Sequence, residues 1–141
     1  MNQHLHLVTL GVRDFETSKK FYTETLGWKP SSASSEDVVF IQAGGIVLSI
    51  YPREKLAEDA LVSPEGQGFA GFTLAYNAQS ESEVDEIISD LKAKGVKILK
   101  EPQKVFWGGY SSYFADPDGY CWEVAYNPFF PFDESNNLKL D

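Results

Sequence analysis

The sequence predicts a mixed α+β fold that is built from two copies of one module. Apolar residues recur at helical spacing in two segments, 14–26 and 80–95. A short strand-like segment precedes each of them, and Thr9 in the first copy aligns with Thr73 in the second. Strand-like segments joined by a tight turn follow each helix. Two copies of a strand, a helix and three further strands therefore account for most of the chain.

The composition predicts one soluble globular domain. The 141 residues are 43% hydrophobic and 14% aromatic, which is enough for an ordinary core. The formal net charge is −9, from 21 acidic and 12 basic residues, and the chain contains no run of Lys or Arg. This charge argues against nucleic acid and anionic membranes as partners.

Two absences from the sequence point to the cytoplasm. No stretch approaches the ~18 consecutive apolar residues of a membrane span, and the N-terminus has no export-signal pattern. The only cysteine, Cys121, can form no internal disulfide, which suits a reducing compartment. No His or Asn pattern lies beside it, so we expect a packed thiol rather than a nucleophile.

Module one is predicted to span residues 4–52. Its first strand is LVTLGV at 7–12, and Asp14 is placed to cap the helix that follows. The segment 38–52 reads as two strands around the turn AGG. Residues 53–68 carry Pro and Gly without a sustained period, so they are predicted to be a linker with one short helical turn at most.

Module two is predicted to span residues 69–128, which completes a single domain over 1–128. GFTLAY at 71–76 should form its first strand. Ser80 and Glu83 have the spacing of a capping box at the start of the second helix, and Gly95 ends that helix. The sequence DPDG at 116–119 is typical of a type I turn, so the flanking strands should pair as a hairpin.

Alternation along the strands sorts their residues onto two faces. One face is bulky and should pack beneath the helices. The other carries small or polar residues, namely Leu7, Thr9, Gly11, Val47, Ser49 and Tyr51 in module one and Gly71, Thr73, Ala75, Cys121, Glu123 and Ala125 in module two. Two interpretations of this second face remain: it lines a cavity that contains one carboxylate, Glu123, or it is a solvated face of an antiparallel sheet.

Two motifs in this order, LGVRDFETSKKFYTETLGW at 10–28 and FADPDGYCWEV at 114–124, carry a family resemblance. The chain resembles the vicinal oxygen chelate superfamily, which includes glyoxalase I, extradiol dioxygenases, and bleomycin and fosfomycin resistance proteins. The resemblance covers residues 5–128. It implies two βαβββ modules that form an incomplete eight-stranded barrel around a ligand cavity, and it implies a homodimer.

In metal-dependent members of that superfamily, a divalent ion is held by His, Gln or Glu side chains in the cavity. The resemblance places the four corresponding positions at Leu7, Ser49, Gly71 and Glu123. Only Glu123 has a customary ligand side chain, and a divalent ion needs three or more protein ligands. We therefore expect no cofactor, although a metal held by other ligands stays an alternative.

The two histidines, His4 and His6, are in phase with Val8 on the helix side of the first strand, which predicts surface positions. A one-residue bulge would turn His6 toward the cavity instead. Even then, His6 and Glu123 would make only two ligands.

Glu123 is the candidate catalytic residue, because a carboxylate in an apolar cavity can act as a general base or anchor a ligand. The alternative is that Glu123 is inherited from the family without a function here, and that hydrogen bonds to neighbouring Tyr or Ser residues hold it. The candidate ligand-binding residues are Thr9, Ser49, Tyr51, Arg53, Thr73, Trp107, Tyr110 and Cys121. For Arg53 the alternative is an exposed side chain, and for the aromatic residues it is the core.

Residues 129–141 form a tail with three phenylalanines, which should dock on the domain itself or on a second subunit. The leading hypothesis is a metal-free protein of the glyoxalase and bleomycin-resistance type that binds a small apolar or aromatic molecule. Glu123 would transform this molecule as a base or only hold it. The alternatives are a metal-dependent lyase or dioxygenase and a non-catalytic interaction module.

Overall fold

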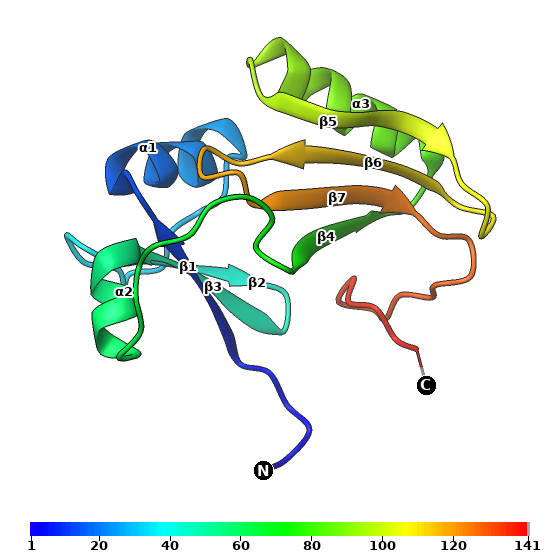
Figure 1. Ribbon diagram of the computed structural model, residues 1–141. Coiled ribbons are helices and arrows are strands. Elements are labelled where there is room, and N and C mark those ends of the chain that lie inside the picture. Colours follow the sequence, from blue (N-terminus) through cyan, green and yellow to red (C-terminus); the bar gives the residue numbers. More distant parts are fainter. Residues whose placement is uncertain (141) are drawn as a thin grey trace. The chain divides into compact units, whose positions relative to one another are not determined.

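The computed structural model describes residues 1–140 and divides the chain into two compact units (Figure 1). Unit 1 comprises Met1–Gly66 with Glu134–Asn137, and unit 2 comprises Gln67–Asp133 with the tail from Leu138 onward. The boundary at Gly66 lies inside the predicted linker. Each unit contains one sheet and at least one helix that packs on it, which confirms the α+β class.

Unit 1 holds a three-stranded sheet in the order β1-β3-β2. Strands β1 and β3 are parallel, and β2 is antiparallel to β3. The elements are β1 (Leu7–Val12), α1 (Phe15–Lys20), a π-helical turn η1 (Phe21–Thr25), β2 (Val39–Ala43), β3 (Ile46–Pro52) and α2 (Arg53–Asp59). The core of the unit includes Leu10, Val12, Tyr22, Ile41 and Ile50, all nearly inaccessible to water.

The first helix begins where the sequence predicts. The Asp14 carboxylate accepts a hydrogen bond of 2.9 Å from the backbone N–H of Thr17, which caps α1. The last turn is wider than expected, because the N–H of Leu26 donates to the carbonyl of Phe21, five residues back. Gly27 then takes a φ of 70°, a conformation that favours glycine, and ends the helix.

The segment after β3 is a helix of seven residues, α2, where the sequence predicts a linker with one turn at most. This helix covers part of the face that carries Thr9 and Ser49. A Cβ atom at Gly11 would lie only 3.1 Å from the side chain of Leu56 and 3.3 Å from the Cα of Arg53. Helix α2 therefore packs directly against Gly11, where a larger residue would not fit. This end of the face is filled and does not line a cavity.

Of the eight strands that the resemblance implies, seven form within residues 1–140. In unit 1 the strand expected between η1 and β2 is reduced to one bridge, between Pro30 and Ile41. Proline has no N–H group and cannot donate to a sheet ladder, so pairing at this point stays minimal.

Unit 2 holds a four-stranded sheet in the order β4-β7-β6-β5. The parallel pair is β4 with β7, and the other pairs are antiparallel. The elements are β4 (Thr73–Ala78), α3 (Glu81–Ala93), β5 (Lys97–Lys104), β6 (Tyr110–Ala115) and β7 (Cys121–Tyr126). Helix α3 runs across one face of this sheet and contacts β5, β6 and β7 (Figure 1).

The cap at Ser80 forms as predicted, but the return bond of the Glu83 carboxylate goes to Gln79 instead of Ser80. The Ser80 hydroxyl accepts a hydrogen bond from the N–H of Glu83, and the Glu83 carboxylate accepts one of 2.6 Å from the N–H of Gln79. The apolar side of α3 buries Val84, Ile88 and Leu91. Gly95 follows the helix with a φ of 79°.

The turn at 116–119 also forms as predicted. The N–H of Gly119 donates to the Asp116 carbonyl, and the Asp116 carboxylate accepts from the N–H groups of Asp118 and Tyr120. This turn sets the register of the β6–β7 hairpin. None of the helices in residues 1–140 is long and apolar enough to cross a membrane.

Candidate functional site

Glu123 lies on the face of the unit 2 sheet that points away from α3. It is half-buried in β7, with Tyr113 of β6 as its cross-strand partner on one side and Ala75 of β4 on the other. Its sequence neighbours Trp122 and Val124 point to the opposite face and are buried. The alternation along β7 thus sends the carboxylate to the face opposite the helix.

Two polar side chains, Ser111 and Lys100, form a chain of hydrogen bonds that begins at the Glu123 carboxylate. The Ser111 hydroxyl donates a hydrogen bond of 2.8 Å to Oε1 of Glu123. The ammonium group of Lys100, from β5, donates to the Ser111 hydroxyl oxygen over 3.3 Å. Ser111 is only 1% exposed, so this hydroxyl is fixed between a carboxylate and a cation.

Tyr113 completes the surroundings of Glu123. Burial raises the pKa of the Tyr113 phenol, and the negative charge of Glu123 and a hydrogen bond to it raise this pKa further. A hydrogen bond to Thr73 acts in the opposite direction. The Lys100 ammonium lies 5.5 Å from the centre of the Tyr113 ring.

We call Glu123, Ser111, Tyr113, Thr73 and Lys100 the Glu123 cluster. It combines an acceptor that can take a proton, a phenol that keeps its proton at neutral pH, and a cation within one sheet face. Such a combination can move a proton and stabilise negative charge on a bound molecule. It can also serve only to anchor a polar group of a ligand.

Two predicted binding residues of unit 2 share this face with Glu123. Thr73 is exposed at the start of β4, and Cys121 is its half-buried cross-strand partner in β7. The Cys121 thiol lies 3.7 Å from the carbonyl oxygen of Gly119.

The predicted binding residues Trp107 and Tyr110 lie elsewhere in unit 2. The Tyr110 hydroxyl donates a 2.7 Å hydrogen bond to Asp85 of α3, so Tyr110 belongs to the helix side of the sheet. The Trp107 ring lies directly over Gly109, where a Cβ atom would overlap with it. The placement of Tyr110 follows from alternation along β6, where Ser111 and Tyr113 take the Glu123 face. The placement of Trp107 follows from the β5–β6 connection, whose path the sequence does not reveal.

The other predicted binding residues belong to unit 1. Thr9 and Ser49 are cross-strand partners in the parallel β1–β3 pair, and Ser49 is only 2% exposed. Tyr51, two residues further along β3, is half-buried. The Arg53 guanidinium donates a 2.6 Å hydrogen bond to the Pro64 carbonyl, so it holds the loop after α2.

The four positions to which the resemblance assigns metal ligands do not fit a divalent ion. Leu7 and Gly71 supply no donor atom, and a Ser hydroxyl beside one carboxylate is a weak ligand set. His4 and His6 are exposed, with ring centres 4.4 Å apart. Across residues 1–140 no three His, Cys, Asp or Glu side chains gather. That the protein has no cofactor stays a prediction.

The sequence predicts a Ser or Tyr neighbour bonded to Glu123 only as an alternative, and it does not identify Ser111, Tyr113 or Lys100. The turn at 116–119 contains a signal for the first two, because its hairpin register places Ala115 opposite Cys121 and Tyr113 opposite Glu123. No comparable signal exists for Lys100. It comes from β5, whose register with β6 shifts on both sides of this residue.

The chain is similar to known proteins in its match to a family model, in sequence and in structure. The model described as "Glyoxalase/Bleomycin resistance protein/Dioxygenase superfamily" matches residues 4–124. A glyoxalase-related enzyme from Fulvimarina pelagi is 33% identical, with 99% of each chain covered and a TM-score of 0.89. The uncharacterized protein YqjT of Bacillus subtilis (strain 168) is 28% identical over 81% of this chain and 91% of its own.

A more distant solved structure shows the fold alone. The lactoylglutathione lyase from Agrobacterium tumefaciens is 21% identical, with 94% of this chain and 100% of that chain covered, and its TM-score is 0.72. Together with the family match, these likenesses confirm the α+β fold of that family, with seven strands in two sheets within residues 1–140.

Proposed function

The chain belongs to the glyoxalase/bleomycin resistance protein/dioxygenase superfamily, and from this premise we propose that it binds a small apolar or aromatic molecule beside Glu123. The observation that carries the proposal is the Glu123 cluster on the face opposite α3. The half-buried carboxylate has a hydroxyl donor at 2.8 Å and a cation bonded to that hydroxyl. A carboxylate on a solvated surface would need only water as its partner, so this arrangement supports a functional role.

The chemistry that we propose is proton transfer next to a carbonyl group, as in a lyase or isomerase. Glu123 would take the proton from the carbon beside the carbonyl, and the electron pair of that C–H bond would move toward the carbonyl oxygen. Tyr113 would donate a hydrogen bond to this oxygen, and Lys100 would offset the charge that develops there. Return of the proton to another atom of the same molecule completes the balance.

Ligand binding tests the proposal. We expect thermal-shift screening with small aromatic ketones and aldehydes to find compounds that raise the melting temperature of the wild-type protein. Glu123→Gln keeps the shape of the side chain but removes its charge and basicity, so these shifts should fall or vanish. Glu86→Gln, an exposed position on α3, is the matched control and should keep them. Equal shifts in all three proteins would refute a role for Glu123.

Metal analysis tests the cofactor prediction. We expect elemental analysis of untagged protein to find far less than one manganese, iron, nickel or zinc ion per chain, also after these ions are offered. Near-stoichiometric metal that is lost in Glu123→Ala would contradict this. Such a result would favour the metal-dependent lyase or dioxygenase alternative.

The proposed setting is a cytoplasmic homodimer that binds neither nucleic acid nor membranes. A single half-buried cysteine is compatible with a reducing compartment. The net charge of −9 makes binding to polyanions unfavourable.

A further inference from the structure

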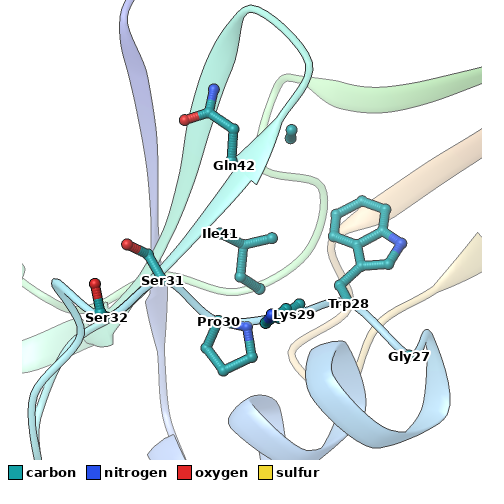
Figure 2. A pocket seen from close by; sticks show the side chains of 9 residues that line it. Gly27, Trp28, Lys29, Pro30, Ser31, Ser32, Ile41 and Gln42 are labelled. Carbon is teal, nitrogen blue, oxygen red and sulfur yellow. The ribbon is translucent and has the colours of Figure 1, made fainter.

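We propose that unit 1 contains a second binding site, independent of Glu123, that takes a flat aromatic carboxylate. The site is a groove of about 730 Å³ beside the outer edge of β2, a volume typical of small-molecule sites. It is lined chiefly by Trp28, Lys29, Pro30, Ser31, Ile41 and Gln42 (Figure 2). None of these residues belongs to the Glu123 cluster, so the site goes beyond the proposed function.

The groove exists because the chain before β2 stays paired with this strand only briefly. Ser31 donates its N–H to the Phe40 carbonyl over 2.7 Å, and Pro30 bridges Ile41. The bridge at Pro30 is an isolated one and lies outside the ladder of β2 with β3. Figure 2 shows the segment of Trp28 to Ser32 running beside β2, with the Ile41 side chain extending from the strand toward Pro30.

The backbone of Gln42 directs a donor and an acceptor to this edge. The N–H of its cross-strand partner Val47 donates to the backbone carbonyl of His6, on the side of β1. The Gln42–Val47 pair is therefore a non-hydrogen-bonded pair of the β2–β3 ladder, and Gln42 points its N–H and C=O away from β3. Phe40, two residues earlier, uses the same direction for its bonds with Ser31 and Ser34.

The walls of the groove suit an aromatic ring. Trp28 is half-buried. Its backbone N–H donates to the Tyr22 carbonyl across the wide last turn of the first helix, which fixes the backbone position from which the indole side chain extends. The rings of Trp28 and Tyr22 lie 6.2 Å apart, so the indole also has a packing partner. The side chains of Pro30 and Ile41 add apolar surface to the lining beside Trp28 (Figure 2).

The polar groups of the groove suit one carboxylate. Lys29 supplies a positive charge, and no ion pair within residues 1–140 engages it. The Gln42 carboxamide is held by the carbonyls of Gly44 and Ile46, at 2.7 and 3.1 Å, so its position is fixed. A carboxylate between Lys29 and the Gln42 N–H would meet one cation and one backbone donor while its ring lies along Trp28.

The experiment uses 2-naphthoate as the probe and 2-naphthamide as its uncharged counterpart, with ¹⁵N-labelled full-length protein. We expect naphthoate to shift the backbone amides of Ser31 and Gln42 and the indole N–H of Trp28. Lys29→Gln should weaken this binding about fivefold, in line with one exposed charge pair. The matched control Lys20→Gln, on the exposed side of α1, should leave the dissociation constant unchanged.

Three results would overturn the site: shifts that avoid these amides, equal affinity for the amide and the carboxylate, or equal loss of affinity in both lysine variants. Glu123→Gln separates the two proposals. It should leave naphthoate binding at Gln42 intact even if the ligands of the Glu123 cluster are lost, and a parallel loss in this variant would also refute an independent site.

Discussion

At the scale of single residues, Tyr113 reports on the charge of Glu123. Its phenol has a pKa above the ordinary value of about 10, first because of burial and then because of Glu123. We expect Glu123→Gln to lower this pKa toward the ordinary value without reaching it, because burial remains. Titration by ¹³C NMR of labelled tyrosine would measure it. Tyr110, whose raised pKa depends first on Asp85, is the internal control and should not move.

The same shift has a consequence for stability. A phenol whose pKa is raised by folding is neutral in both states below about pH 9, so its contribution is unchanged there. Above that pH the unfolded chain ionises first, and stability falls as the pH rises. Tyr113→Phe should therefore lose less stability than the wild type between about pH 9 and 11 in urea unfolding. Identical slopes in both proteins would show that Tyr113 is not perturbed.

The sequence identifies Glu123 but not its surroundings. The residue follows from strand alternation after a recognisable turn, and both are local features. Ser111 and Tyr113 depend on the hairpin register, and Lys100 depends on a strand with irregular pairing. The cluster assembles from three strands, so only tertiary pairing shows which side chains meet.

At the scale of elements, helix α3 depends on its cap. The Ser80 hydroxyl satisfies the N–H of Glu83, which has no partner inside α3. Ser80→Ala should lower the free energy of unfolding by about 1 kcal/mol. Ser89→Ala, an exposed position inside the same helix, should be neutral or slightly stabilising because alanine has the higher helix propensity. Chemical denaturation would measure both, and an equal loss in the two variants would contradict the cap.

The β5–β6 connection requires a residue without a side chain at Gly109. Trp107 lies over Gly109 so closely that any Cβ there must displace the indole. Gly109→Ala should therefore shift the Trp107 indole resonance and destabilise the protein by about 1 to 3 kcal/mol, as overpacking does. Gly45 is the control, because a Cβ atom there meets no other atom within 4 Å and its φ is not positive. A Gly109→Ala protein as stable as Gly45→Ala would show that the ring moves at no cost.

Elements with strong local signals are those that the sequence predicts well. Strand β1 begins and ends where its pattern does, and α3 has both a cap and a stop residue. Helix α2 lacks a side-chain cap and a sustained period, and contact with Gly11 stabilises it instead. The wide turn at Phe21–Thr25 has no sequence signal that we recognise. These differences are tertiary effects that override weak local preference.

At the scale of the whole molecule, the repeat gives each unit one sheet with β-strands in corresponding order. Strands β1 and β4 correspond, as do β3 and β7. The pairing of β1 with β3 in unit 1 and that of β4 with β7 in unit 2 are both parallel. The copies differ in what they add. Unit 1 gains α2 and a groove beside β2, whereas unit 2 keeps all four strands and the Glu123 cluster. One duplicated module thus supplies two chemically different surfaces.

The exposed aromatic residues of unit 2 predict self-association. Phe106 is fully exposed in the β5–β6 connection, and Phe129 of the tail is 70% exposed. Phe129 lies against the same connection, because its ring lies 3.2 Å from where a Cβ of Gly108 would be. Phenylalanines at this exposure are costly to leave in water, and a second copy of the chain would cover them.

We therefore expect the wild-type protein to have about twice its 15.8 kDa chain mass in size exclusion with light scattering. Phe106→Ser should weaken the dimer by about tenfold or more, because each copy loses a buried ring. Val62→Ser is the control, since it makes an apolar-to-polar change at an exposed site of unit 1. A wild-type protein that stays monomeric at every concentration would refute the dimer, and equal dissociation of both variants would place its interface elsewhere.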